Sequence, residues 1–154
     1  CELAVVLGRD VRDVPAGQTR DYIFGYTILN DVSARDVQTA HKQWYFGKSL
    51  DGFTPIGPCI VTADAFADYP PRLGIRSFVN GEKRQDSNTA LQIFDIDYVI
   101  AELSQGMTLK AGTIIATGTP AGVGMGMDPP QFLKPGDVVR CEIEGIGTLT
   151  NPVK

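Results

Sequence analysis

The chain has 154 residues, of which 43% are hydrophobic, so it is long enough for one domain with a buried core. Its 18 acidic residues outnumber 14 basic ones and no basic cluster occurs, which argues against a nucleic-acid-binding surface. No apolar run approaches the roughly 18 residues that a membrane span needs. The 17 glycines and 10 prolines favour short strands and tight turns over long helices.

The first half of the chain is predicted to alternate strands with polar segments. Apolar, β-branched and aromatic runs indicate the strands, although a short helix at 19–24 is an alternative at the start of the second. The polar stretch 30–38 has helical potential, and 41–58 is predicted to be rich in loops. The predicted strands are 3–8, 22–29 and 59–63.

Two hairpins are predicted in the second half. Asn80-Gly81 is the strongest short hairpin signal, because both positions of a type I′ turn need positive φ. Residues 73–79 and 82–86 should therefore pair across it. A last hairpin is expected over 142–149, around Gly145.

One amphipathic helix is predicted between Asp95 and Gln105. Its apolar residues recur at the spacing i, i+3, i+4, i+7, which forms one stripe on one face. Asp95 is the expected N-cap and Gly106 the expected glycine after the last turn. The stripe consists of Ile96, Val99, Ile100 and Leu103.

The cysteines and the start of the chain bear on the cellular compartment of the protein and on the extent of its sequence. Cys1, Cys59 and Cys141 are far apart and form no CxxC motif, so we expect buried, reduced thiols and a cytoplasmic protein. The start shows no signal peptide. The chain begins without Met, directly on a predicted strand, so we expect a further N-terminal segment before residue 1.

Polar side chains gather in 30–38. On a helix that turns about 100° per residue, Asp31, Arg35 and Gln38 lie within about 60° of one another. Ser33 and Asp36 have the spacing of a capping box, which would begin a helix there. Spacing alone leaves two interpretations: a functional cluster, or a capped surface helix with an Asp31–Arg35 pair, which is the more common case.

Lys48 lies between a glycine and a serine, as in the end of a phosphate-binding loop. That loop needs a glycine at position 42, which is lysine here, so the motif is rejected. Lys48 is then either a candidate cation in a turn or a solvated lysine. His41 is the only histidine, which excludes zinc sites built on several histidines, and we expect it at the surface.

A glycine-rich loop at 118–126 follows a predicted strand. It contains GxGxG, but Pro129-Pro130 breaks the helix that a dinucleotide-binding motif needs. The amides of the loop and Thr119 could still face an anion such as a carboxylate, with a wide structural turn as the alternative. Glu2, at the start of the first strand, matters only if it has a partner.

Six segments in order resemble the fumarylacetoacetate hydrolase family, most closely its bacterial-type hydratases, isomerases, acylpyruvate hydrolases and oxaloacetate decarboxylases. The resemblance covers essentially the whole chain. It implies an α+β fold, a β-rich mixed-sheet roll or barrel with few short helices, forming a single catalytic domain over 1–154 that assembles as a homodimer. The segments are ELAVVLG at 2–8, FGYTILNDVSARDVQ at 24–38, QWYFGKSLDGFTPIGP at 43–58, VNGEKRQDSNT at 79–89, LSQGMTLKAGTIIATGTPAGVG at 103–124 and LKPGDVV at 133–139.

The resemblance also implies a metal centre with Mg²⁺ or Mn²⁺ held by three carboxylates. Two come from a Glu-x-Glu pair, whose second member matches Glu2, and the third matches Asp31. The first glutamate of the pair would stand one position before Cys1, outside this sequence.

The remaining implied site residues bind the substrate. Arg35 and Gln38 match residues that bind or polarise substrate oxygens, and Lys48 matches an active-site lysine that stabilises oxyanion charge. Gly118 and Thr119 match the loop that receives the substrate carboxylate. The group that activates water is expected upstream of residue 1.

The implied activity is metal-dependent chemistry on 2-oxo or 2-enol acids, which chelate hard cations. C–C bond hydrolysis of an acylpyruvate through an enolate is the expected reaction. Isomerisation of a 2-hydroxydienedioate of the 5-carboxymethyl-2-hydroxymuconate type, as in aromatic catabolism, and oxaloacetate decarboxylation are alternatives. A non-catalytic remnant is a further alternative, because the first metal-binding glutamate is missing, and nucleotide binding at 118–126 is weaker still.

Overall fold

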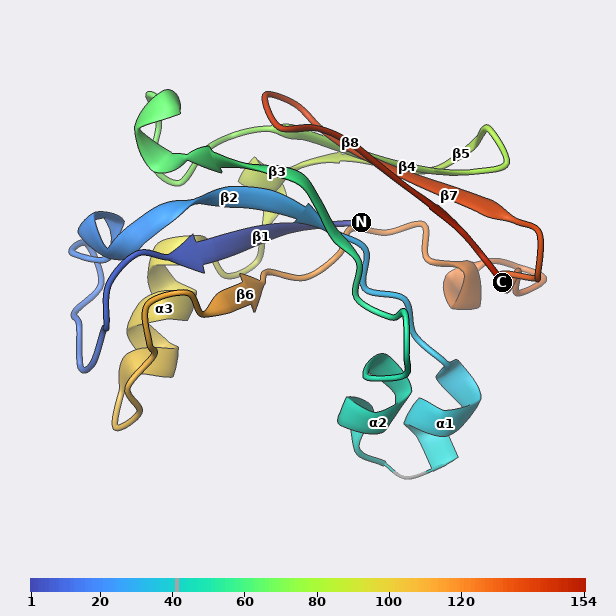
Figure 1. The fold of residues 1–154 in the computed structure, drawn as a ribbon, viewed down its shortest axis with the longest axis horizontal. Coiled ribbons are helices and arrows are strands. Elements are labelled where there is room, and N and C mark those ends of the chain that lie inside the picture. The colour runs from blue at the N-terminus through green and yellow to red at the C-terminus, as the bar shows by residue number, and fades with distance from the viewer. Residues whose placement is uncertain (41) are drawn as a thin grey trace.

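The computed structural model describes residues 1–40 and 42–154, so the expectation for His41 lies outside the described residues. Within these ranges the strands form two four-stranded sheets, in the orders β3-β2-β1-β6 and β5-β4-β7-β8 (Figure 1). The first sheet comprises β1 (Glu2–Leu7), β2 (Ile23–Leu29), β3 (Ile56–Thr62) and β6 (Ile114–Ala116). The second comprises β4 (Gly74–Val79), β5 (Glu82–Asn88), β7 (Val138–Ile143) and β8 (Gly147–Pro152).

Helices are few and short, and every strand pair in the described ranges is antiparallel. The α-helices are α1 (Arg35–Ala40), α2 (Trp44–Lys48) and α3 (Ile96–Ser104), and 3₁₀ turns span Arg20–Tyr22, Ala63–Ala65, Thr89–Leu91 and Gly124–Gly126. The predicted α+β class is confirmed. None of the helices in the described residues combines the length and apolar character that crossing a membrane requires.

The central strand β1 is buried along its whole length, between β2 and β6. Leu3, Val5 and Leu7 join one core cluster with Ile96 and Ile100 of α3. Full burial of each such aliphatic side chain contributes about 1.5–3 kcal/mol relative to exposure. The core therefore fixes the strand that begins with Glu2.

The two predicted hairpins and the predicted cap of α3 are confirmed. Asn80 and Gly81 have φ of 52° and 85°, and β4 pairs with β5 across them. The last hairpin forms around Gly145, between β7 and β8. The Asp95 side chain accepts the Tyr98 N–H at 2.8 Å and caps α3 as predicted.

The short helix considered as an alternative at 19–24 is present as a 3₁₀ turn at Arg20–Tyr22, before β2. Three expectations need correction. The segment 41–58, expected to be rich in loops, also contains α2. Leu103 is 38% exposed, so the buried stripe of α3 is narrower than predicted. Cys141 is buried, but Cys59 is exposed because it lies on β3, an edge strand with no buried residue.

Candidate active site

The antiparallel pairing of β1 and β2 brings the two predicted carboxylates to one end of the first sheet. Glu2 is paired with Leu29, the last residue of β2, and Asp31 follows two residues later. The Asn30 N–H donates to the Pro55 carbonyl at 3.0 Å, which holds the chain as it leaves the sheet. The sheet register therefore sets Asp31 beside Glu2.

Glu2 is a buried carboxylate with one backbone partner. Its side chain accepts the Gly118 N–H at 2.9 Å. Burial raises the pKa of Glu2 above its ordinary value, and the negative charge of Asp31 raises it further; the Gly118 hydrogen bond and the Lys48 charge oppose the rise. The negative charge of Asp31 thus acts on the buried Glu2 carboxylate.

Asp31 has a cationic partner from a distant part of the chain. The Lys48 ammonium donates to the Asp31 carboxylate and, at 3.2 Å, to the Ser33 hydroxyl. Both side chains of the ion pair are mostly buried, at 20% and 26% exposure. The surface pair expected between Asp31 and Arg35 is wrong, because Asp31 precedes α1 and faces Lys48 instead.

The helix start also differs from the prediction. The first residue of α1 is Arg35, and the Ser33 hydroxyl donates to the Asp31 carbonyl at 3.1 Å instead of capping the helix. Ser33 thus stabilises the bend that carries Asp31.

Close packing of α2 on α1 positions Lys48. A Cβ at Gly47 would lie 2.9 Å from both the Ala34 carbonyl oxygen and the Gln38 Cβ, so only glycine fits. The Ala34 N–H donates to the Gly47 carbonyl at 2.8 Å across the same contact. Lys48 is the last residue of α2, not part of a turn as predicted, and this contact sets it opposite Asp31.

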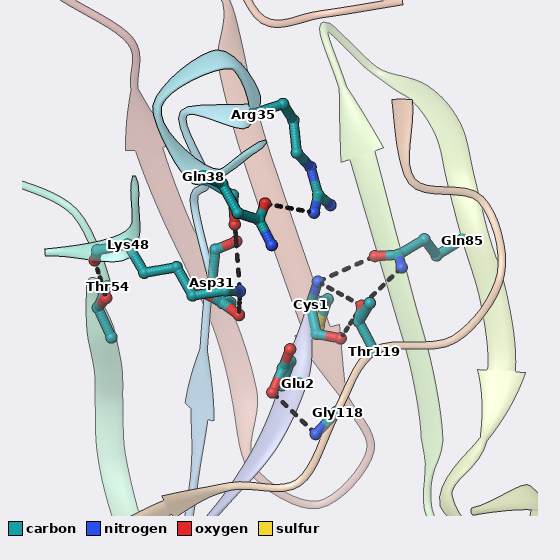
Figure 2. A network of polar contacts seen from close by, with 11 residues as sticks. Cys1, Glu2, Asp31, Arg35, Gln38, Lys48, Thr54, Gln85, Gly118 and Thr119 are labelled. Atoms are coloured by element: carbon teal, nitrogen blue, oxygen red, sulfur yellow. Dashed lines mark hydrogen bonds and ion pairs between the residues drawn. The ribbon is translucent and has the colours of Figure 1, made fainter. Parts of the chain in front are cut away.

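Arg35 and Gln38 act as a pair on α1. The Arg35 guanidinium donates to the Gln38 side-chain oxygen at 3.0 Å. Gln38 is buried beneath α2, so it is a fixed acceptor that orients the guanidinium. In Figure 2, Arg35 lies above the two carboxylates, and Lys48 reaches Asp31 from the side.

The Gly118–Thr119 segment is tied to the start of β1. The Gly118 N–H is taken by Glu2, and the Thr119 hydroxyl donates to the Cys1 carbonyl at 2.9 Å. These two donors, expected to receive a substrate carboxylate, are engaged within the protein (Figure 2).

Gln85 on β5 is a site residue that sequence reasoning missed. It is buried, and its side-chain nitrogen donates to the Thr119 hydroxyl at 2.8 Å and to the Pro120 carbonyl at 2.9 Å. Its oxygen accepts from the Cys1 nitrogen at 2.9 Å. The sequence offered one signal for Gln85: it lies next to Arg84 in the segment VNGEKRQDSNT, which resembles the family.

A cleft of about 990 Å³ joins these groups and takes its lining from both sheets and from α1 and α2. Gln38 is outside the lining and contacts Arg35, which is part of it. Within 1–40 and 42–154, no set of three or more acidic, histidine or cysteine side chains could hold a metal ion, so Glu2 and Asp31 stand as a pair. The predicted residues that line the cleft are Glu2, Asp31, Arg35, Lys48, Gly118 and Thr119.

Known proteins resemble this chain in sequence and in fold. Residues 1–154 match the family model described as fumarylacetoacetate (FAA) hydrolase C-terminal. The chain is 49% identical over 152 residues to the oxaloacetate tautomerase YisK of Bacillus subtilis, covering 99% of this chain and 50% of the relative. It therefore spans about half the length of that relative.

Two solved structures extend the comparison. A fumarylacetoacetate hydrolase from Exiguobacterium antarcticum is 52% identical with a TM-score of 0.96, covering 99% of this chain and 55% of that chain. A 5-carboxymethyl-2-hydroxymuconate delta-isomerase from Mycobacterium smegmatis is 48% identical with a TM-score of 0.87, covering 98% and 56%. The chain belongs to the fumarylacetoacetate hydrolase family.

Proposed function

We propose that the protein carries out proton transfer on short 2-oxo or 2-enol carboxylic acids, interconverting keto and enol forms of an oxaloacetate-type substrate or shifting a double bond. The observation that carries the proposal is the mostly buried Lys48–Asp31 pair beside Glu2 in the cleft. The names tautomerase and isomerase of two relatives support this choice over hydrolysis. Keto–enol interconversion and the double-bond shift both pass through an enolate.

The cationic side chains suit an enolate. Lys48 is held by two oxygen acceptors, and Arg35 is oriented by the buried Gln38. Positive groups fixed before the reaction stabilise developing oxyanion charge without reorganising. Lys48 would face the enolate oxygen, and Arg35 another oxygen of the substrate.

Glu2 and Asp31 fit a hard divalent cation such as Mg²⁺ or Mn²⁺. Both offer carboxylate oxygens, the ligands that these ions prefer, and the charge of Asp31 raises the pKa of Glu2, so a cation at the pair would relieve their repulsion. A bound cation would supply Lewis acidity toward the oxo group of the substrate. Lys48, which pairs with Asp31, would add a second positive charge.

Thr119 stays a proposed receptor of the substrate carboxylate, with a condition that the structure adds, whereas the single N–H of Gly118 is bound to Glu2. The Thr119 hydroxyl must exchange the Cys1 carbonyl for the substrate. Arg35 needs no such exchange with a backbone group, so we propose it as the first contact for the carboxylate.

C–C bond hydrolysis of an acylpyruvate is the second candidate. It is favoured by the 52% identity to a protein named fumarylacetoacetate hydrolase. In hydrolysis an activated water adds to the acyl carbonyl, and C–C bond cleavage expels the enolate of pyruvate as the leaving group. Decarboxylation of oxaloacetate would release carbon dioxide and leave the same pyruvate enolate.

The full-length protein with Mg²⁺ separates these reactions. Enol oxaloacetate is added and the loss of enol absorbance is followed, while pyruvate is assayed to detect decarboxylation. Acetylpyruvate is tested in parallel for cleavage to acetate and pyruvate. We expect fast ketonisation without cleavage. Cleavage of acetylpyruvate without accelerated ketonisation would establish hydrolysis instead, and inactivity in all three assays would support the non-catalytic alternative.

A further inference from the structure

Two similar chains of hydrogen bonds tie β1 to the segment that follows β6. In the first, the Gln85 side chain donates to the Thr119 hydroxyl at 2.8 Å, which donates to the Cys1 carbonyl at 2.9 Å. In the second, the Gln92 side chain donates to the Thr117 hydroxyl at 2.7 Å, which donates to the Leu3 carbonyl at 2.8 Å. We call these the Gln85 relay and the Gln92 relay.

The two relays lie on either side of the point at which the backbone pairing of β1 with β6 ends. At Thr117 the backbone N–H still donates to the Leu3 carbonyl at 3.2 Å, beside the hydroxyl. β1 pairs with β6 at Ala4 and Ala116, so the same register places Glu2 opposite Gly118. Gly118 has a φ of 96°, outside the strand region, and this conformation favours glycine. Its N–H donates to the Glu2 side chain rather than to the β1 backbone. The hydroxyls of Thr119 and Thr117 bind the carbonyls of Cys1 and Leu3, the residues on either side of Glu2.

Glu2 therefore lies between the two relays, but only one of them faces the cleft. Gln85 and Thr119 line the cleft together with Glu2 and Asp31. Gln92 and Thr117 line a separate cavity of about 460 Å³ behind the Gly118–Thr119 segment.

The Gln85 relay has more fixed contacts than the Gln92 relay. Gln85 is 4% exposed, and its side-chain nitrogen also donates to the Pro120 carbonyl. Both hydrogens of its amide are thus used within the protein, and satisfied buried hydrogen bonds rigidify a network. Figure 2 shows Gln85 and Thr119 on the side of Glu2 opposite Lys48.

We propose that Gln85 is a positioning residue, which acts through Thr119, Cys1 and Gly118 to hold the Glu2 carboxylate toward the cation site. The inference rests on the proposed role of Glu2 as a cation ligand. Partners that orient metal ligands typically contribute about 10- to 100-fold to metal affinity. Gln92 makes the same type of contact away from the cleft and should contribute to folding alone.

The test compares Gln85→Leu with Gln92→Leu in the full-length protein. The probe is Mn²⁺ alone, and its dissociation constant is measured by calorimetry and by the paramagnetic resonance of free Mn²⁺. We expect Gln85→Leu to raise the dissociation constant about 10-fold, while Gln92→Leu leaves it within about twofold although it also lowers the melting temperature. Equal dissociation constants in the two variants would overturn the inference.

A second pair of variants covers the case in which Gln85→Leu does not fold. Thr119→Val keeps the shape of the side chain but loses the hydroxyl, and should weaken Mn²⁺ binding about as much as Gln85→Leu. Thr119→Ser keeps the hydroxyl and should restore it. Wild-type affinity in Thr119→Val overturns the positioning role alone, whereas a wild-type protein that binds no Mn²⁺ overturns the proposed cation site and this inference with it.

Discussion

The Lys48 ammonium is bound to the Asp31 carboxylate, although the two residues are 17 positions apart in the sequence. This pair joins the end of α2 to the segment after β2, next to the buried Glu2. It places one cationic and two carboxylate side chains in the lining of the cleft, the arrangement from which we propose enolate chemistry. The proposed function depends on this relationship.

Removing the Lys48 charge should abolish most of the activity. Loss of one preorganised oxyanion donor costs about 100- to 1,000-fold in kcat, and we expect Lys48→Met to fall in this range in the ketonisation assay, with a smaller change in KM. Lys83→Met is the control, because Lys83 is an exposed lysine that pairs with Asp86 on the surface of β5. Equal kcat values for the two variants would contradict the role of Lys48.

A methyl group at Gly47 should disturb the site through packing. The added Cβ would meet the Gln38 Cβ and the Ala34 carbonyl at 2.9 Å, so α2 must shift relative to α1. We expect Gly47→Ala to lower the free energy of unfolding by about 1–3 kcal/mol and to reduce kcat by displacing Lys48. In Gly126→Ala the new Cβ meets Val123 at an ordinary 3.7 Å, so this control should retain stability and activity.

Acid should weaken one link between β7 and the β4–β5 turn. The Asn80 side chain and the Lys134 N–H hold the pKa of Asp137 below its ordinary value of 3.8. A lowered carboxyl pKa stabilises the folded state above the unfolded pKa, and the contribution is lost as the pH falls through the folded pKa. Melting curves of the wild type and Asp137→Ala should therefore differ at neutral pH and converge in acid. A difference that does not change with pH would contradict this assignment.

The cysteines should differ in reactivity. Burial raises the pKa of Cys141, whereas Cys59 is exposed. Because the thiolate is the reactive form, iodoacetamide should modify Cys59 in the folded protein and Cys141 only after unfolding. Peptide mass spectrometry measures both, and equal rates in the folded state would be inconsistent with the burial of Cys141.

Elements with local signals could be predicted from the sequence. The type I′ turn at Asn80-Gly81 and the Asp95 cap each depend on neighbouring residues, and both are present. Helix α2 could not be predicted in this way, because Trp44, Tyr45 and Gly47 are poor helix formers. Its place is set by the contact of Gly47 with α1, which only the folded chain provides.

The site residues, too, were only partly predictable from the sequence. Family resemblance identified Glu2, Asp31 and Lys48, and the structure brings all three to one cleft. Spacing alone suggested a different partner for Asp31, because helical periodicity considers only residues three or four positions away. Gln85 carries no periodic signal, and its contacts form only when β5, the start of β1 and the segment after β6 meet.

Thermal unfolding with Mg²⁺ and oxalate, a mimic of the enolate, tests the central claim most directly. We predict that Mg²⁺ and oxalate together raise the melting temperature of the full-length protein, and that Asp31→Asn abolishes the rise. A ligand at about 100 times its dissociation constant stabilises the folded state by about 2.7 kcal/mol, which is readily measured. Asp36→Asn, on the exposed first turn of α1, should retain the shift. An absent shift in the wild type, or an equal shift in Asp31→Asn, would contradict the account.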